Sequence, residues 1–436
     1  MALKTVARWS FALLLLLPAS RLVGQSPLQW PVPPPGPPRR LVFPEILIAP
    51  AEAAKLLKGG ATALDARGSE AYAAGHLPGA ATAGETPPGT IVVYGGEDGA
   101  GREEVARQYR RLRREGISEV RVLDGGIAAW RASGRPVETG PPNSRPNPAS
   151  TGARTALEVE VETKQVAEAF GQEGFELLDV RDARGWDRWR TPPTFAAGHI
   201  PYSLPFDPRA LLPARGWPRP AEVRRRLAAF GPRPGDPVNL ESTFVLYAGD
   251  EADPRLDLGY LLLTLAGLDA RVFPGGWKEW TAGGARPVVR VISAAELAGR
   301  LRRGDPGLSA DRPARDLVLV DLREPRDFAI GHLPGALSLP FVHFAADFEK
   351  TVESGWPGAD RATLPLVLYC YGIDCVRSRK AGAQAAHAGF RDLLWFRGGV
   401  QEWREAGLPL LDSPPAPPPT PASPAATSPG RGDARP

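Results

Sequence analysis

Four short sequence landmarks occur three times in this 436-residue chain, each time in the same order. They are an apolar run ending in Asp-x-Arg, the tetrapeptide Gly-His-[Leu/Ile]-Pro, a strand-like run ending in tyrosine, and the pattern Gly-Gly-x-x-x-Trp. The three sets begin at Asp65, Gly75, Ile91 and Gly125; at Asp179, Gly198, Phe244 and Gly275; and at Asp321, Gly331, Leu366 and Gly398. A period of roughly a hundred residues or more predicts tandem domains of one fold, because solenoid repeats run only about 20–50 residues.

Strand and helix patterns alternate within each copy, and the third copy illustrates this. Its predicted strands are Val289–Ile292, Asp316–Asp321, Leu366–Cys370 and Asp392–Phe396. Its predicted helices are Ala294–Leu301, opened by a capping box from Ser293 to Glu296, and Arg379–Ala388. Such alternation within about 100–130 residues indicates an α/β fold, in which each domain is a small parallel sheet with helices on both faces.

The landmarks and the composition of the intervening stretches divide the chain. We expect domains at residues 41–139, 153–288 and 289–411, with a Pro/Asn/Ser-rich linker at 140–151. A proline-rich lead-in at 25–40 precedes them, and a disordered Pro-rich tail at 412–436 follows. In the second copy Arg181 and His199 lie 18 positions apart, against 9 in the other copies, which predicts a surface insertion around 186–193.

The first 24 residues have the form of a secretory signal peptide. Lys4 and Arg8 precede an apolar run over residues 9–18, and small residues follow up to Gly24. The run is about half the length of a membrane span, which needs about twenty residues. We therefore expect an exported protein, periplasmic or secreted, with no stable membrane anchor after processing, in a compartment that permits disulfides.

The overall composition argues against two other classes of protein. The net charge is only +4 and no basic block occurs, so nucleic-acid binding is not predicted. Two cysteines cannot make a disulfide scaffold. The histidines outside the repeats, His343 and His387, have no ligand partners at metal spacing, so no zinc site is expected.

Both cysteines, Cys370 and Cys375, lie in one stretch of the third copy. Cys370 follows the buried strand, a loop containing Gly372 comes next, and a helix pattern begins near Ser378. A helix N-terminus, loop amides and the charge of Arg377 are surroundings that favour a thiolate and hold an oxyanion beside it. A buried strand cysteine joined to a loop cysteine by a structural disulfide is the alternative.

The recurrent landmarks resemble those of the rhodanese superfamily, and the resemblance covers about residues 41–411. It implies compact α/β domains in which a catalytic cysteine follows the central strand and the next loop wraps a persulfide. The family's usual activity is the transfer of sulfane sulfur from thiosulfate or a mercaptan to a thiophilic acceptor. The resemblance implies no cofactor.

Matched to the family position by position, the third copy alone carries the nucleophile. Cys370 follows Tyr369, whereas Gly95 and Ala248 follow the corresponding tyrosines, so the first two copies resemble inactive modules. The family loop commonly reads Cys-x-x-Gly-x-Arg-Ser, with arginine five positions after cysteine. Here Arg377 lies seven positions after Cys370 and Cys375 stands between them.

The resemblance predicts an exported sulfurtransferase with Cys370 as persulfide carrier and Cys375 as a second thiol or alternative carrier. Gly372, Arg377 and Ser378 would bind a small anionic sulfur donor, and a thiol or cyanide would accept the sulfur. Two alternatives remain: a thiol-disulfide or persulfide redox carrier that uses both cysteines, and a non-catalytic binding scaffold. The sequence names no protein partner. The landmark histidines and aspartates, including His332 and Asp321, are interpreted as structural because they also occur in the copies without cysteine.

Overall fold

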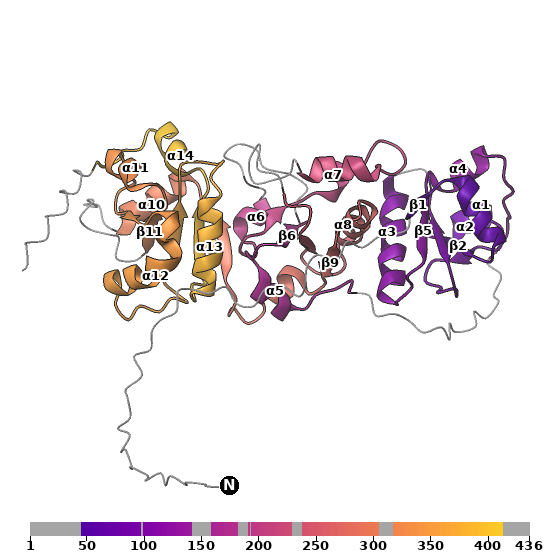
Figure 1. Ribbon diagram of the computed structural model, residues 1–436, viewed down its shortest axis with the longest axis horizontal. Helices are drawn as coiled ribbons and strands as arrows, with labels where there is room; N and C mark the ends of the chain where they lie inside the picture. The colour runs from indigo at the N-terminus through magenta and orange to yellow at the C-terminus, as the bar shows by residue number, and fades with distance from the viewer. Residues whose placement is uncertain are drawn as a thin grey trace, which may run out of the picture.

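The computed structural model describes residues 45–96, 99–141, 158–181, 191, 193–228, 238–304 and 317–412. These residues form three α/β modules that follow one another along the long axis of the molecule in chain order (Figure 1). Each module contains one sheet, and every strand pairing within the three sheets is parallel. The predicted fold class is therefore confirmed.

The first module has a five-stranded sheet in the order β1-β5-β4-β2-β3. Its strands are β1 (Leu47–Ile48), β2 (Thr62–Asp65), β3 (Ala81–Thr82), β4 (Ile91–Tyr94) and β5 (Val120–Leu123). Its helices are α1 (Pro50–Lys58), α2 (Ser69–Ala74), α3 (Gly99–Arg114) and α4 (Gly126–Ala132).

The second module has a four-stranded sheet in the order β7-β6-β8-β9. Its strands are β6 (Phe175–Asp179), β7 (Leu204–Pro205), β8 (Thr243–Tyr247) and β9 (Ala270–Phe273). Its helices are α5 (Thr163–Ala169), α6 (Pro193–Ala197), the 3₁₀ turn η1 (Pro208–Leu211), α7 (Pro220–Ala228), α8 (Pro254–Leu265) and α9 (Gly276–Thr281). Most of the predicted insertion at 186–193 lies outside the described residues, and Pro193 begins α6.

The third module repeats the five-stranded order of the first as β10-β14-β13-β11-β12. Its strands are β10 (Val288–Val291), β11 (Val318–Asp321), β12 (Leu337–Ser338), β13 (Leu366–Tyr369) and β14 (Asp392–Phe396). Its helices are α10 (Ala294–Gly304), α11 (Pro325–Ile330), α12 (Phe341–Gly355), α13 (Arg377–His387) and α14 (Gly399–Glu405). The Ser293 hydroxyl at the start of α10 accepts a hydrogen bond from the Glu296 amide at 3.3 Å, which is one of the two hydrogen bonds of the predicted capping box.

The central strand of each sheet is almost entirely buried because helices cover both faces. All four residues of β4 and of β13 are buried, as are four of the five residues of β8. Continuous apolar runs of this kind are expected of parallel strands between two helical layers. The carboxyl end of such a strand is the place where the following loop emerges from the core.

The first and second modules meet through the helices that follow their central strands, α3 and α8. Ten of the twelve residues of α8 are buried, because the sheet of its own module covers one side and α3 the other. A buried ion pair fixes this contact: the Arg110 guanidinium donates to the Asp257 carboxylate at 2.5 Å. Arg110 also donates to Glu160 at 2.9 Å.

The second and third modules share a strand. The backbone of Val289 pairs with His199 of the second module, in the way that Glu138 pairs with His76 and Leu411 with His332. Val289 also belongs to β10, which pairs with β14 of the third module. The boundary expected between residues 288 and 289 therefore falls inside a strand that serves both modules.

The predicted signal peptide at 1–24, the lead-in at 25–40 and the tail from 413 onward lie outside the described residues. Within the described ranges, no helix is both long and apolar enough to cross a membrane.

Candidate active site

Cys370 lies at the carboxyl end of β13, the central strand of the third sheet. Strands β11 and β14 flank it, with Tyr369 in register with Asp321 on one side and Phe396 on the other. The Cys370 side chain is almost fully buried, with 1% of the residue exposed. In the other two sheets Gly95 and Ala248 occupy the same place after the central strand.

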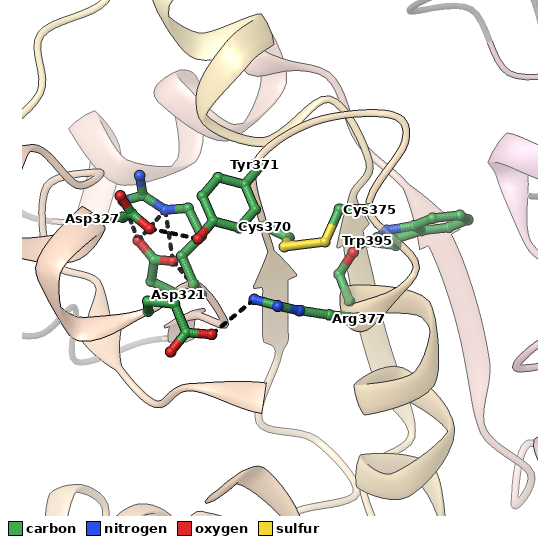
Figure 2. Close-up of a disulfide and its surroundings, with 10 residues drawn as sticks. Asp321, Asp327, Cys370, Tyr371, Cys375, Arg377 and Trp395 are labelled. Carbon is green, nitrogen blue, oxygen red and sulfur yellow. Dashed lines mark hydrogen bonds and ion pairs between the residues drawn. A yellow bond between two sulfur atoms is a disulfide. The ribbon is translucent and has the colours of Figure 1, made fainter. Parts of the chain in front are cut away.

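The loop from Cys370 to Val376 closes on itself through a disulfide between Cys370 and Cys375 (Figure 2). Their Cα atoms lie 6.2 Å apart, within the range that a disulfide spans. The Cys375 amide donates to the Gly372 carbonyl at 3.0 Å, which makes the loop a tight turn. The pairing that the sequence left open is therefore present in the structure. The Cys375 amide is already used within the turn, and so it does not point at the Cys370 sulfur.

The Gly-Gly-x-x-x-Trp landmark anchors the first part of this loop. The amides of Val400 and Gln401 at the start of α14 donate to the carbonyls of Cys370 and Tyr371, at 3.1 and 3.0 Å. The close approach requires glycine at 399, where φ is +55° and an added Cβ would lie 2.2 Å from the Cys370 carbonyl oxygen. The landmark thus fixes the position of the candidate nucleophile through its backbone.

The same anchor occurs in the two modules without cysteine. The Ile127 amide donates to the Gly95 carbonyl at 3.0 Å, and the Trp277 amide to the Ala248 carbonyl at 2.8 Å. The anchor is therefore a property of the fold, and the chemistry depends on the residue that it holds.

The Asp-x-Arg landmark and the strand tyrosine form a buried cluster of hydrogen bonds beneath the loop, which we call the lock. The Tyr369 hydroxyl donates to the Asp321 carboxylate at 2.7 Å and accepts from the Leu333 amide at 3.3 Å. Arg323 pairs with the same carboxylate at 2.6 Å and donates to the Gly331 carbonyl at 2.7 Å. Burial and the adjacent Asp321 raise the pKa of Tyr369 well above its usual range, so the phenol remains neutral.

This lock also recurs in all three modules. Tyr94 donates to Asp65 at 2.7 Å, and Tyr247 donates to Asp179 at 2.8 Å. The landmark histidine completes it: His332 stacks on Phe328 with ring centroids 3.8 Å apart, and its Nδ1 lies 3.0 Å from the Phe328 carbonyl. These contacts agree with the structural interpretation of Asp321 and His332.

Arg377 begins α13 and lies beside the loop, as the sequence predicts (Figure 2). Its guanidinium donates to the Glu324 carboxylate at 3.2 Å, and about a third of the side chain is exposed. The Arg377 guanidinium carbon lies 5.9 Å from the centre of the Tyr371 ring. The arginine is therefore held at the site by an acidic partner and an aromatic ring, and its exposed part remains accessible to an anion.

The other two predicted donor-binding residues have different surroundings. The Ser378 hydroxyl is buried and accepts a hydrogen bond from the Trp395 indole nitrogen at 2.9 Å, so it joins α13 to β14. Gly372 lies in the loop, where an added Cβ would be 2.7 Å from the Gln401 side-chain oxygen. The structure thus brings Gly372 and Arg377 to the cysteines, and it commits the Ser378 hydroxyl to the helix–sheet contact.

Two residues near the cysteines were not identified from the sequence. Tyr371 is 41% exposed, and its hydroxyl donates to the Asp327 carboxylate at 2.5 Å. Arg397 follows β14 and is buried, and this burial lowers its pKa to about 10 despite the opposing charges of Asp374 and Glu402. A signal for Arg397 was available in the sequence: the residue before Gly-Gly is Asp124 in the first copy and Pro274 in the second.

Comparison with known proteins gives a match to a family model and matches to individual proteins. The family model described as the rhodanese-like domain matches residues 49–133, 162–283 and 300–406. A protein of Mycobacterium tuberculosis named "Putative thiosulfate sulfurtransferase SseB" is 29% identical over 292 residues, which cover 56% of this chain and 97% of that protein. The tRNA uridine(34) hydroxylase of Salmonella agona is 32% identical over 123 residues, which cover 27% of this chain and 33% of that protein.

Two solved structures also match over part of the chain. YnjE matches with a TM-score of 0.44 and 18% identity, covering 57% of this chain and 69% of that one. The wild-type structure of EanB matches with a TM-score of 0.43 and 19% identity, covering 56% and 68%. The family matches cover one segment in each module and most of the described chain, and the protein belongs to the rhodanese-like domain family.

Proposed function

We propose that the protein is a sulfurtransferase that carries sulfane sulfur as a persulfide on Cys370. One observation supports this most strongly: among the three equivalent strand ends, the third alone carries a thiol, and Arg377 and the start of α13 lie beside it. The similarity to the Mycobacterium tuberculosis protein named "Putative thiosulfate sulfurtransferase SseB" supports the same reaction class.

The proposed reaction is covalent catalysis by a thiolate. The Cys370 thiolate attacks the outer sulfur of thiosulfate, the sulfur–sulfur bond of the donor breaks, and sulfite leaves with its electron pair. Arg377 attracts the anionic donor and the departing sulfite, because a guanidinium binds oxyanions through charge-assisted hydrogen bonds. A thiol or cyanide then takes the outer sulfur. The reaction requires that the Cys370–Cys375 disulfide first be reduced.

The test is thiosulfate:cyanide sulfur transfer by the full chain after mild reduction. Cys370→Ser is expected to abolish thiocyanate formation, because a serine hydroxyl has no comparable nucleophilicity. Cys375→Ser is expected to retain it, since cyanide can take sulfur directly from Cys370. Activity in Cys370→Ser together with its loss in Cys375→Ser would move the carrier to Cys375 and refute the assignment.

A second candidate function is favoured by the disulfide itself. Two cysteines that pair within one loop are the arrangement of a thiol-disulfide carrier. Under this hypothesis either serine substitution abolishes function, and the reduced protein transfers electrons to a disulfide substrate without consuming thiosulfate. The same pair of variants, assayed with each substrate, separates the two functions.

We also propose that the protein is exported. The signal-peptide form of residues 1–24 supports this, and so does a cysteine pair that persists as a disulfide in oxidising compartments. The mature chain should then begin between about residues 21 and 25. Mass analysis of protein recovered outside the cytoplasm tests the proposal, and a chain that still carries Met1 would refute it.

A further inference from the structure

The loop that holds Cys370 also holds a second sulfur, that of Cys375, which is bonded to the Cys370 sulfur. The disulfide links the two side chains, and the turn from Gly372 to Cys375 keeps their Cα atoms 6.2 Å apart. The Val400 and Gln401 amides fix the backbone on the Cys370 side. Any sulfur atom added to Cys370 is therefore attached beside the Cys375 sulfur, without a rearrangement of the fold.

We propose that Cys375 is a resolving thiol that discharges the Cys370 persulfide as hydrosulfide. The Cys375 thiolate attacks the Cys370 Sγ, the bond from that atom to the outer sulfur breaks, and hydrosulfide leaves with the electron pair. The product is the Cys370–Cys375 disulfide that the structure contains. The inference rests on the proposed function and adds the fate of the transferred sulfur.

The two reaction steps, from thiosulfate to the protein disulfide, need no added oxidant. Thiosulfate and two protein thiols give sulfite, hydrosulfide and one protein disulfide, with the two thiol protons carried off by the products. The two electrons that reduce the sulfane sulfur come from the cysteines, which become the disulfide. A further turnover requires a dithiol reductant, a small molecule or a protein, that returns the disulfide to two thiols by exchange.

The exposure of the two cysteines gives the exchange a direction. Cys370 is almost fully buried, whereas Cys375 is partly exposed. An external thiol therefore attacks Cys375 and releases Cys370, the residue needed for the next donor. Thiol–disulfide exchange depends on which sulfur can be reached, and here the resolving residue is the more exposed of the two.

Two opposite charges, those of Asp374 and Arg397, lie near Cys375. Asp374 directly precedes Cys375, and a neighbouring carboxylate disfavours a thiolate. The buried Arg397 interacts with Asp374 and offsets that charge. The equivalent positions in the modules without cysteine are Asp124 and Pro274, so this arginine accompanies the cysteine pair.

A single-turnover experiment tests the proposal. The reduced full chain, freed of reductant, is mixed with thiosulfate in the absence of cyanide and added thiol. Sulfite, sulfide and the intact protein mass are then measured. Wild type is expected to release sulfite and sulfide in equal amounts, and its mass should fall by two hydrogens as the disulfide forms.

The two serine variants identify the step that each cysteine performs. Cys375→Ser is expected to release sulfite but no sulfide, and to gain the mass of one sulfur atom, which cyanide then removes as thiocyanate. This trapped persulfide also shows that the variant is folded. Cys370→Ser is expected to release neither product.

Sulfide release by Cys375→Ser at the wild-type level would overturn the resolving role and leave the proposed function intact. A stable persulfide on wild type, with no sulfide, would do the same. No sulfite from wild type would refute the proposed function itself. Loss of the sulfite burst in Cys375→Ser alone would show that Cys375 is the carrier, and it would overturn both assignments.

Discussion

Replacing Gly399 by alanine should damage the site through the backbone anchor beneath Cys370. Gly399 has φ +55°, and an alanine Cβ would lie 2.2 Å from the Cys370 carbonyl oxygen and 3.0 Å from the Gly372 nitrogen. A left-handed conformation costs a non-glycine residue roughly 1–2 kcal/mol. The contact with rigid backbone adds an overpacking cost of about 1–3 kcal/mol. We therefore expect Gly399→Ala to lower the free energy of unfolding by about 2–5 kcal/mol.

Gly407→Ala is the matched control for the conformational term. Gly407 follows the same helix with φ +69°, and an added Cβ would meet nothing within 4 Å. The free energy of unfolding of this variant should therefore fall by only roughly 1–2 kcal/mol, the cost of a left-handed conformation at a non-glycine residue. The difference between the two variants isolates the contact with the Cys370 loop.

Sulfur transfer separates the loop effect from general destabilisation. To make room for the alanine, the backbone at Cys370 must move by about an ångström, and a misplacement of that size costs on the order of 10²-fold in rate. Gly126→Ala creates the same clash in the first module, with the Cβ 2.3 Å from the Gly95 carbonyl oxygen. It should destabilise that module and leave transfer unchanged.

Both quantities are measured on the full chain, by denaturant unfolding followed through tryptophan fluorescence and by thiosulfate:cyanide transfer. Wild-type transfer in Gly399→Ala, with no more destabilisation than in Gly407→Ala, would refute the role assigned to the anchor. Equal loss of transfer in Gly126→Ala would show that the effect is not local to Cys370.

Three further predictions concern stability. Asp257→Asn leaves the buried Arg110 with weaker neutralisation, so we expect unfolding of the first two modules to become easier by about 3 kcal/mol, and a change below about 1 kcal/mol in denaturant titrations would contradict this. Tyr369→Phe removes the hydroxyl between Asp321 and the Leu333 amide and should cost the third module about 1–3 kcal/mol, whereas an unchanged denaturation midpoint would show that the lock contributes nothing. Burial lowers the pKa of His199 to about 3, so the folded state excludes a proton that the unfolded state binds. The free energy of unfolding of the second module should therefore fall by up to about 1.4 kcal/mol per pH unit as the pH decreases from about 6.5 toward 3. His199→Gln should flatten this pH dependence relative to wild type in denaturant titrations.

The sequence was sufficient to predict the modules and the place of the cysteines because both depend on local patterns. A short apolar run such as 366–369 is typical of a central parallel strand that is buried on both faces, and the residue after such a strand lies where the loop leaves the sheet. The repetition of the landmarks in three copies was also informative, because only one copy has cysteines. The landmarks recur beside Gly95 and Ala248, where no thiol is present, so they are interpreted as structural, and the structure gives them contacts within the fold.

The side-chain directions within the site depended on packing that no short pattern encodes. Ser378 follows Arg377 directly, but one step along a helix turns a side chain by about 100°. Arg377 therefore lies beside the loop, whereas Ser378 is buried against Trp395. Arg397 is far from the cysteines in sequence, and it reaches their loop only because β14 lies next to β13. Such a neighbour is predicted from the sheet order, not from spacing along the chain.

The strand end of the first module, where Gly95 takes the place of the cysteine, lies against the second module. Arg102 of α3 donates to the carbonyls of Pro213 and Gly216 in the second module, both at 2.9 Å. Trp217 and Gly216 line the same small cavity as Gly95, the residue that replaces the cysteine. The strand end of the first module is thus covered by its neighbour, and a thiol there would have no room for a donor.

The third module has no such cover at the equivalent place among the described residues. Tyr371, directly after Cys370, is 41% exposed, and Arg377 is partly exposed beside it. The two modules without cysteine contact each other through α3 and α8, the helices that follow their central strands. At the third strand end these partly exposed side chains lie beside the buried Cys370, and under the proposed function a small anion reaches Cys370 past them.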